Sequence, residues 1–397
     1  MVQIKPFEVE EWMDRLETTP GVLNIAETCC ESVSIQELTQ LSSDPASPGP
    51  LDIATRKLPY GAIYGSEGLR QNIANLYQDD ASGPLPSDQV VPTQGAIVAN
   101  FLLLYTLVGP GDHVICLYPT YQQLHEVPRS LGAEVSLWKP KAEDGYVPDV
   151  HELDELAREN TKMIIINNPN NPTGATTPKP VLMDVVAFAK ARNIILMADE
   201  VYRPLFHSLP DGEEAPPSIL SLGYDKTIST SSMSKSFSLA GIRLGWIASR
   251  DHSIIEAVKS ARNYTTISVS QLDDRVATYA LSDEVRPNLL KRNMELAKMN
   301  LEILESFVNK YPAVCSWVKP TAGTTAMVGF RRHGRPVKDD EFCLEVLDKT
   351  GVLVMPGSTC FGDGNEFEGQ MRFGYVCNTD VLKVGLQKLG KYIEETF

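Results

Sequence analysis

Short apolar runs that alternate with helical patterns occupy the middle of the chain. Strands that alternate with helices along a sequence pair in parallel sheets, which are buried on both faces and are therefore apolar throughout. The order of the runs predicts an α/β protein whose large domain, at residues 51–284, has a mostly parallel mixed sheet between helices. The runs that read as strands are HVICLYP, AEVSLW, KMIIINN, NIILMADE, TISTSS and LGWIAS.

The rest of the chain is expected to form a smaller α+β domain from residues 1–50 and 285–397. A chain of 397 residues is too long for one ordinary hydrophobic core, and a linker rich in Pro, Ser and Gly is expected near residues 41–50. The segment RPNLLKRNMELAKMNLEILESFV carries an apolar stripe, which predicts one long helix that bridges the two domains. The stripe consists of Leu290, Met294, Leu301, Leu304 and Phe307.

Composition argues against several classes of function. The formal charge of −15 disfavours binding to nucleic acid, because that affinity comes from clustered Lys and Arg. No segment is apolar enough to span a bilayer, and the first residues lack the pattern of a secretory signal. Seven cysteines without a CxxC pair predict reduced thiols, and six scattered histidines predict no metal site. We therefore expect a soluble cytoplasmic protein with no membrane or nucleic-acid partner.

Several apolar runs end in polar residues, and in open α/β sheets ligands bind at the carboxyl ends of the strands. Asn171 lies in the turn NNPNNPTG after one run, and Asp199, Glu200 and Tyr202 follow the next. An unpaired carboxylate that is buried at such a position is costly. We therefore expect Asp199 or Glu200 to meet a cation or a proton donor, or else to point to water.

Lys235 closes the serine-rich run TISTSSMSK, and Arg243 follows it eight residues later. A lysine that forms a Schiff base needs a confined site and a neighbouring cation that keeps it partly deprotonated. Arg243 offers that cation and also a forked grip on phosphate. A lysine that is simply solvated is the alternative.

Two weaker signals accompany this lysine. Gly95 and Ala96 begin a strongly apolar helix after the turn PTQG, where small residues leave backbone N–H groups open to an anion. A buried core helix with a glycine start is the alternative. Tyr121 in YPTYQQ could stack on an aromatic ligand or pack in the core.

One ligand accounts for all of these groups, namely a phosphate-bearing aromatic aldehyde bound covalently to Lys235. The expected contacts are the helix start and Arg243 for the phosphate, Tyr121 for the ring face, Asp199 for a ring nitrogen, and Asn171 with Tyr202 for a ring hydroxyl.

The order Asn-Pro-Thr-Gly, Asp-x-x-Tyr and Ser-x-x-Lys, with an arginine eight residues after the lysine, resembles the fold-type I pyridoxal-phosphate enzymes of the class I/II aminotransferase family. Matching segments run from about Tyr60 to Arg372. The resemblance implies the family's fold, pyridoxal 5'-phosphate as cofactor and an amino acid as substrate. It implies that Lys235 forms the Schiff base and later moves the proton at the substrate's Cα, and that Asp199 keeps the pyridine nitrogen protonated.

The resemblance also implies the remaining binding residues. Arg372 in GQMRFGY, with Asn171, is expected at the substrate, where Arg372 would bind the α-carboxylate; a surface arginine is the alternative. Tyr60, with Tyr64 as a rival, would reach the phosphate of the other subunit, which implies a homodimer with shared active sites. The other expected cofactor contacts are Asn171 and Tyr202 at the 3-hydroxyl oxygen, and Gly95, Ala96, Ser232 and Arg243 at the phosphate.

Two departures from the family pattern leave the reaction open. The region LNIAETCCESVS has no glycine, whereas ordinary members carry a glycine-bearing loop there that covers the substrate. RNYTTISVSQL and GVLVMPGSTCFG resemble the capreomycidine synthase branch, in which a related scaffold eliminates a β-substituent from an amino acid and cyclises it. Tyr264, Thr265 and Thr266 would then lie near the substrate, with a structural strand edge as the alternative.

The leading hypothesis is therefore an aminotransferase that acts at the Cα of an amino acid. The alternative is an enzyme of specialised metabolism that performs β- or γ-elimination, replacement or cyclisation, since these reactions share the first carbanion. A third hypothesis, a non-enzymatic regulator with the same fold, is disfavoured because Lys235, Asp199 and Arg243 are all present.

Overall fold

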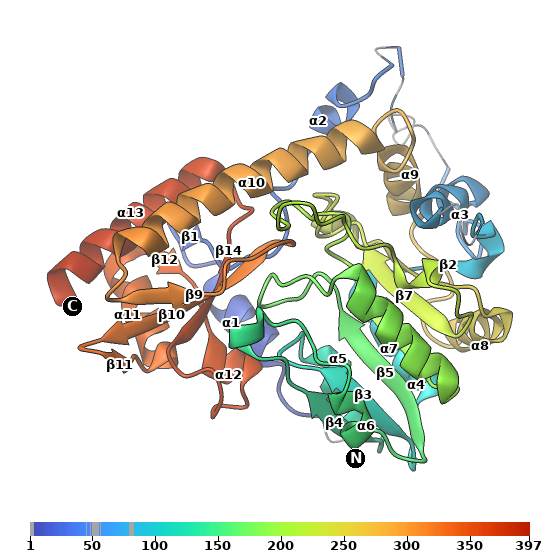
Figure 1. The fold of residues 1–397 in the computed structure, drawn as a ribbon. Coiled ribbons are helices and arrows are strands. Elements are labelled where there is room, and N and C mark those ends of the chain that lie inside the picture. Colours follow the sequence, from blue (N-terminus) through green and yellow to red (C-terminus); the bar gives the residue numbers. More distant parts are fainter. Residues whose placement is uncertain (1–3, 45, 48, 50–54, 56, 79–82) are drawn as a thin grey trace.

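The computed structural model describes residues 4–44, 46–47, 49, 55, 57–78 and 83–397. Within these residues, a seven-stranded and a five-stranded sheet form two lobes, and the long helix α10 (Arg286–Lys310) runs along both (Figure 1). The expected domain boundary between residues 50 and 51 and part of the expected linker lie outside the described residues. The proposed division at residues 51–284 therefore stays a prediction.

The seven-stranded sheet has the strand order β2-β8-β7-β6-β5-β3-β4. The strand β8 runs antiparallel to both of its neighbours, and the other pairs are parallel. This confirms the mostly parallel mixed sheet, although Pro92 and Thr93, which we expected in a turn, belong to β2. The strands are β2 (Val90–Thr93), β3 (His113–Leu117), β4 (Glu134–Trp138), β5 (Thr161–Asn167), β6 (Ile195–Asp199), β7 (Thr227–Ser232) and β8 (Gly245–Ser249).

Successive residues of the central strands point to opposite faces of this sheet, as the two-residue period of a strand requires. In β5, Ile164 and Ile166 belong to one hydrophobic core, whereas Met163 and Ile165 belong to the core on the other face. Because both cores are apolar, β5 reads in the sequence as an unbroken apolar run.

Helices cover both faces of this sheet. Leu102 of α4 and Ile254 of α8 pack into one core, while Leu182 of α7 and Val276 of α9 pack into the other. The helix α3 begins after its N-cap residue Ser66, whose Oγ accepts a hydrogen bond from the backbone N–H of Leu69 at 3.1 Å. The helices of this lobe are α2 (Ile35–Gln40), α3 (Glu67–Ala74), α4 (Gly95–Leu107), α5 (Gln123–Ser130), α6 (Glu152–Leu156), α7 (Lys179–Ala191), α8 (His252–Arg262) and α9 (Gln271–Ala280), and the 3₁₀ turns are Asn75–Tyr77, Ser87–Gln89, Ala142–Asp144, Ile219–Ser221 and Ala240–Ile242.

The second lobe is built on an antiparallel sheet of order β11-β10-β14-β13, with β9 beside β10. A separate parallel pair joins β1 to β12, so the start of the chain belongs to this lobe. The strands are β1 (Leu23–Asn24), β9 (Cys315–Trp317), β10 (Thr325–Arg332), β11 (Arg335–Pro336), β12 (Val352–Leu353), β13 (Met355–Pro356) and β14 (Gln370–Gly374), and the helices are α1 (Glu8–Leu16), α11 (Asp339–Thr350), α12 (Gly357–Phe361) and α13 (Thr379–Thr396).

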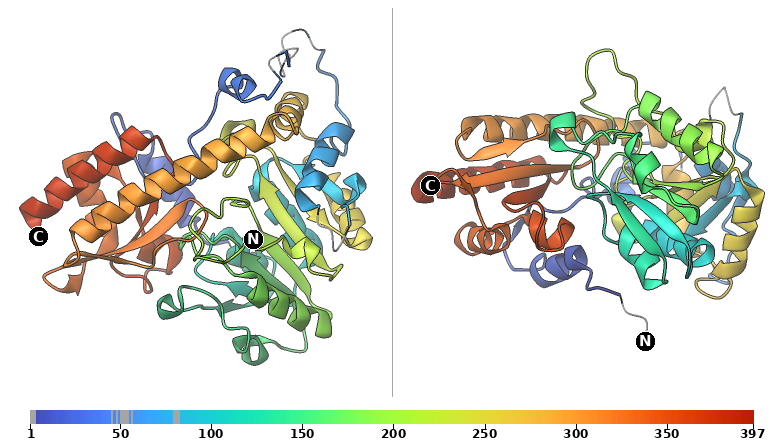
Figure 2. Two further views of the ribbon diagram at one scale, coloured as in Figure 1. Left: turned by 45° about the horizontal axis from the view of Figure 1, so that its top comes forward. Right: turned by 60° about the horizontal axis from the view of Figure 1, so that its bottom comes forward.

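The helix α10 connects the cores of the two lobes, as its apolar stripe predicts. Leu289 and Leu290 pack in or against the core of the larger lobe, whereas Leu301 and Leu304 are buried in the core of the smaller one. Figure 2 shows the lobes joined along α10 from two further directions. No helix in the described parts of the chain is both long and apolar enough to cross a membrane.

Residues 25–31 lie between the two lobes and contact both. On one side, the N–H of Gly374 in β14 donates to the carbonyl of Ile25 at 2.8 Å. On the other, the N–H of Cys30 donates to the carbonyl of Lys235 at 3.4 Å. A Cβ atom at position 374 would lie 1.7 Å from the carbonyl oxygen of Glu27, so only glycine allows this close approach. The backbone of β14 therefore determines where Glu27 and its neighbours lie.

Replacing the buried Leu304 with Ala is expected to destabilise the protein by about 2–5 kcal/mol, because it leaves a cavity in the core that α10 shares with the smaller sheet. The matched control is Met299→Ala on the same helix, since Met299 is exposed. Urea unfolding followed by circular dichroism at one protein concentration measures both. Equal midpoints for the two variants would contradict the assignment of Leu304 to the core.

Candidate active site

A cavity of about 690 Å³ opens between the lobes, at the carboxyl ends of β5, β6 and β7. Its walls come from these strand ends, the start of α4, the helix α1, residues 27–29 and β14. The predicted site residues that line this one cavity are Ala96, Tyr121, Asn171, Asp199, Tyr202, Ser232, Lys235, Arg243 and Arg372.

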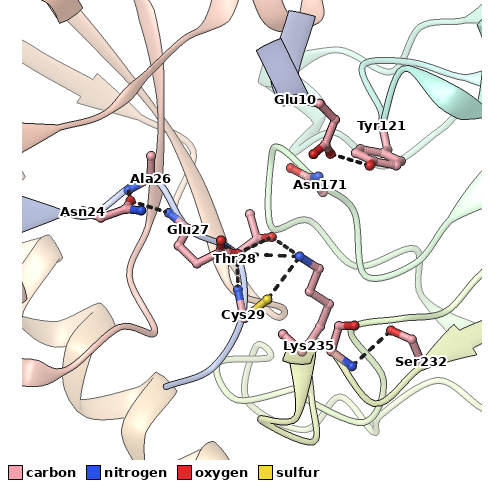
Figure 3. Close-up of polar contacts among 12 residues, drawn as sticks. Glu10, Asn24, Ala26, Glu27, Thr28, Cys29, Tyr121, Asn171, Ser232 and Lys235 are labelled. Carbon is pink, nitrogen blue, oxygen red and sulfur yellow. Dashed lines mark hydrogen bonds and ion pairs between the residues drawn. The ribbon is translucent and has the colours of Figure 1, made fainter. Parts of the chain in front are cut away.

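Lys235 points toward residues 27–29 from the end of β7 (Figure 3). Its Nζ donates to Thr28 Oγ1 at 2.6 Å, lies 3.4 Å from Cys29 Sγ and forms an ion pair with Glu27 Oε1 at 3.7 Å. Burial lowers the pKa of Lys235, but Cys29 and Glu27 more than offset this and hold it above the ordinary value of 10.5. At neutral pH the Glu27 carboxylate is the responsible charge, because burial raises the pKa of the Cys29 thiol to about 11.

The carboxylate of Glu27 has the electrostatics of a paired anion. Burial alone would raise its pKa, but Lys235 and the backbone N–H groups of Thr28 and Cys29 hold the pKa of Glu27 at about 2. These N–H groups donate to Glu27 Oε1 at 2.5 and 2.9 Å. In this state Lys235 is an ammonium ion held by Glu27, and its amine becomes a nucleophile only after it gives up a proton.

Asp199 is a buried carboxylate at the end of β6 that lacks a cationic partner in contact with it among the described residues. Asn100 Nδ2 donates to Asp199 Oδ2 at 3.0 Å, and the N–H of Val201 donates to Oδ1 at 3.2 Å. Burial raises the pKa of Asp199 to about 6, although these two hydrogen bonds lower it. A protonated ring nitrogen in the cavity would supply the missing positive partner.

Glu200, the neighbouring carboxylate, is satisfied within the protein instead. Ser218 and Ser229 donate to its Oε2 at 2.7 and 2.6 Å, and Arg203 Nε lies 3.9 Å away. Glu200 is therefore hydrogen-bonded by side chains of the protein, whereas Asp199 lines the cavity.

The start of α4 forms an anion site together with Arg243. Gln94, the N-cap residue of α4, makes no side-chain capping bond, so the N–H groups of the first turn are free for a ligand. Gly95 has φ +79°, and a Cβ atom there would lie 2.7 Å from Arg243 Nη2. Ser232, Ser234 and Arg243 line the same end of the cavity, and Arg243 Nη1 donates to the carbonyl of Ala240 at 2.9 Å. These groups suit a phosphate.

Arg372 is buried, with an exposed fraction of 3%, and enters the cavity from β14. Its Nη1 donates to Asn171 Oδ1 at 3.3 Å and its Nη2 to the carbonyl of Ala26 at 2.8 Å. Its Nε has no hydrogen-bond partner among the described residues. The alternative of a surface arginine is therefore wrong, and the guanidinium brings a positive charge to the cavity.

The two aromatic residues also take defined places. Tyr121 lines the cavity with its hydroxyl donating to Glu10 Oε1 at 2.6 Å, and its ring packs against Phe7 with centroids 4.8 Å apart. Tyr202 is buried beside Lys235 and Arg372, and burial raises the pKa of its hydroxyl above the ordinary value of 10. A neutral Tyr202 hydroxyl is available to donate a hydrogen bond.

Other candidates lie outside this cavity in the single chain. Tyr60 has an exposed fraction of 83% and Tyr64 of 41%, so their proposed reach into another subunit stays a prediction. Tyr264, Thr265 and Thr266 form the turn that follows α8, and Tyr264 is 91% exposed. The alternative of a strand edge for these three residues is wrong, because their N–H groups bond back to the end of α8 rather than to a strand.

Some residues of the cavity were not expected from the sequence. Asn100 supports Asp199 from the second turn of α4, and its Oδ1 accepts a hydrogen bond from Thr230 at 2.7 Å. Glu27 contacts Lys235 across more than two hundred positions of the chain. An asparagine inside a strongly apolar helix was the available signal for Asn100, since a polar side chain there needs a partner.

The donor set fits pyridoxal phosphate. Asp199 lacks a cation, Arg372 brings a positive charge to the cavity, and the first turn of α4 has open N–H groups beside Arg243. These three needs are met by a protonated ring nitrogen, a substrate carboxylate and a phosphate, respectively.

Comparison with known proteins identifies the lineage of this site. A model of the family described as aminotransferase class I and II matches residues 51–389. Capreomycidine synthase from Streptomyces vinaceus is 28% identical over 386 residues, which cover 96% of this chain and 92% of that protein. Aspartate aminotransferase from Sulfolobus acidocaldarius is 27% identical over 351 residues, covering 85% of this chain and 82% of that protein.

Solved structures agree with this placement. A PLP-dependent aminotransferase from Streptococcus suis has a TM-score of 0.89 at 37% identity and covers 100% of this chain and 99% of its own. The PLP-dependent cyclase OrfR has a TM-score of 0.86 at 27% identity and covers 99% of this chain and 98% of its own. The resemblances to the aminotransferase family and to capreomycidine synthase are confirmed.

Replacing Asp199 with Asn is expected to stabilise the cofactor-free protein at pH 8 by about 1–3 kcal/mol. The folded carboxyl titrates at about 6, above its ordinary value of 3.8, so the wild type loses stability as the pH rises between these values. Asn carries no charge and avoids that loss. Urea unfolding at pH 8 and pH 3.5 measures the difference, which should vanish at the lower pH.

The exposed Asp211 provides the control, since Asp211→Asn should leave stability unchanged at both pH values. A wild type that is more stable than the Asp199→Asn variant at pH 8 without cofactor would show that a protein group already neutralises Asp199.

Proposed function

The chain belongs to the aminotransferase class I and II family and is a pyridoxal-phosphate-dependent enzyme, and we propose that it removes the proton from the Cα of an amino acid and transfers the amino group to an acceptor. The observation that carries the proposal is the meeting of Lys235, Asp199 and Arg372 in one cavity. A nucleophilic amine, a carboxylate for a ring nitrogen and a donor for a carboxylate are the groups that this chemistry requires.

Pyridoxal phosphate, when bound, supplies an aldehyde that joins to amines and a ring that accepts electrons from Cα. Lys235 would hold the cofactor through its Nζ, and the same amine would accept the proton from the substrate's Cα. Asp199 keeps the ring nitrogen protonated, because the buried carboxylate and the cation stabilise each other. The first turn of α4, with Ser232 and Arg243, binds the phosphate.

The remaining residues orient the substrate. Arg372 binds the α-carboxylate from β14, while its Nη1 and Nη2 also donate to Asn171 and to the carbonyl of Ala26. Because Arg372 is held on two sides, the carboxylate position is set before the substrate arrives. Thr28 and Cys29 contact the amine of Lys235 and hold its side chain in position.

Cyclisation or elimination is the second candidate, and a specific observation favours it. The chain aligns with capreomycidine synthase over 96% of its length and superimposes on the cyclase OrfR. In the place where ordinary family members carry a glycine-bearing loop, this chain puts Glu27, whose carboxylate is ion-paired with Lys235 at 3.7 Å. Both reactions begin with the same proton transfer at Lys235.

We also propose that the enzyme works as a homodimer in the cytoplasm. Large apolar side chains are exposed on residues 57–64 and 264–267, and Gln271 Nε2, at the start of α9, donates to the carbonyl of Pro59 in the first of these regions. Such a surface is typical of an interface, and Tyr60 would extend from it toward a second active site. The seven cysteines are all unpaired, which suits a reducing compartment.

Reduction of the holoenzyme with borohydride is expected to attach the cofactor permanently to Lys235. Peptide mass spectrometry should then find the added mass on the peptide that contains Lys235, and Lys235→Ala should lose it together with the visible absorbance of the bound cofactor. Lys226→Ala, at a partly exposed lysine that does not line the cavity, is the control that should retain both. Attachment at any other lysine would contradict the assignment.

A single-turnover experiment without an amino acceptor should distinguish the two reactions. Transamination predicts one equivalent of oxo acid for each active site and recovery of the cofactor in its amine form. Cyclisation or elimination predicts many turnovers, loss of a substituent and recovery of the cofactor as the aldehyde. Chromatography of the released cofactor and products measures this, and the second result would replace the aminotransferase proposal by the cyclase one.

A further inference from the structure

Four carboxylates that line the active-site cavity come from the smaller lobe and from the segment between the lobes. They are Glu10, Asp14 and Glu17 of the helix α1 and its C-terminal flank, and Glu27 of the segment between the lobes. We name this group the acidic wall. The larger lobe contributes none of these residues, so the acidic wall is not part of the strand-end constellation that the family motifs describe.

Glu10, Asp14 and Glu17 lie on one face of α1 and of the residue that follows it. Positions 10, 14 and 17 are related by four and three residues, a spacing that places side chains on the same side of a helix. The helix is held in place by the buried Trp12, whose Nε1 donates to the carbonyl of Val354 at 3.1 Å. Since Trp12 anchors α1 in the core of the smaller lobe, the acidic face is turned toward the cavity by packing.

Few cationic side chains of the protein neutralise the carboxylates of the acidic wall. Asp14 and Glu17 form no ion pair with any residue that the structure describes, and Glu10 accepts a neutral hydrogen bond from Tyr121. Glu27 is paired with Lys235, whose amine is consumed by the cofactor in the working enzyme. Burial and the neighbouring Glu27, Glu10 and Asp14 raise the pKa of Glu17, which shows that these charges are close enough to repel one another.

Arg372 places the substrate in the cavity that the acidic wall lines. It is almost fully buried, its Nε lacks a partner among the described residues, and it lines the same cavity. In the proposed function it binds the α-carboxylate, and Arg243 binds the phosphate. Both arginines are then committed, so neither is left to neutralise the acidic wall.

We propose that the acidic wall binds a positively charged group on the substrate's side chain, so that the enzyme acts on an amino acid with a guanidinium or ammonium group. The inference rests on the proposed function for the position of the substrate, with its carboxylate on Arg372 and its Cα at Lys235. Carboxylates that surround a cation gain attraction, whereas a neutral side chain would leave their mutual repulsion in place. A cleft lined by one sign of charge also raises the local concentration of oppositely charged substrate.

Binding of matched pairs of amino acids to the purified holoenzyme tests this inference. L-arginine is compared with L-citrulline, its neutral isostere, and L-lysine with L-norleucine, by titration calorimetry in the absence of an amino acceptor. At least one cationic member should bind about tenfold more tightly than its neutral partner, the scale of two or three exposed ion pairs. Added salt should weaken the binding of that cationic member and leave the neutral one unchanged.

Variants of α1 separate the acidic wall from general charge effects. The double variant Asp14→Asn with Glu17→Gln should reduce the preference for the cationic member several-fold, whereas Glu11→Gln, at an exposed acid on the same helix outside the cavity, should preserve it. Circular dichroism and the absorbance of the bound cofactor confirm that each variant is folded and loaded.

Each outcome is decisive for the inference. Equal affinities within both pairs, or no binding of either cationic amino acid, would overturn it. A preference that survives the double variant would also overturn it. Tight binding of a cationic amino acid without any change in the cofactor's spectrum would support the acidic wall and contradict the proposed chemistry at Cα, so the two failures are distinguishable.

Discussion

Parallel pairing of β5, β6 and β7 is the constraint on which the site depends. In the register of this sheet, Asn167 lies beside Asp199, and Asp199 beside Thr230. Because parallel strands end at the same edge, the turns that follow them deliver Asn171, Tyr202 and Lys235 to one place. Apolar cores on both faces hold the strands, so polar groups gather only where the strands stop. The chemistry is concentrated at this edge because the rest of the sheet has no room for it.

The N-terminal part of the chain forms the wall of the cavity that the larger sheet does not supply. Residues 25–31 run between the lobes, and α1 lies against the cavity under the anchor of Trp12. They bring a carboxylate to Lys235 and a set of unpaired acids to the substrate side. The cofactor side of the cavity is thus built from common family elements, and the substrate side from a segment that differs in this chain. Specificity and reaction type are therefore expected to depend on this N-terminal segment more than on the sheet.

Several site residues could be predicted because their signals are local. Asn171 lies in a turn with two prolines and a glycine, and Asp199 and Lys235 each follow an apolar strand. Each of these positions can therefore be predicted from a few neighbouring residues. The buried location of Arg372 and the partner of Asp199 could not be read in this way. Asn100 and Asp199, which are hydrogen-bonded, are far apart in the sequence. Arg372 donates to the carbonyl of Ala26, which lies near the start of the chain.

The sequence by itself determined the parallel sheet, the order of the motifs and the residues that are candidates to hold the cofactor, since hydrophobic periodicity and turn residues are local properties of the chain. Tertiary structure alone decided which carboxylate is left for a ligand, because Glu200 is satisfied by Ser218 and Ser229 while Asp199 is not. It also decided that Glu27 meets Lys235 and that Glu10, Asp14 and Glu17 face the same cavity. Such contacts depend on how two lobes and the segment between them pack, and no local pattern encodes that arrangement.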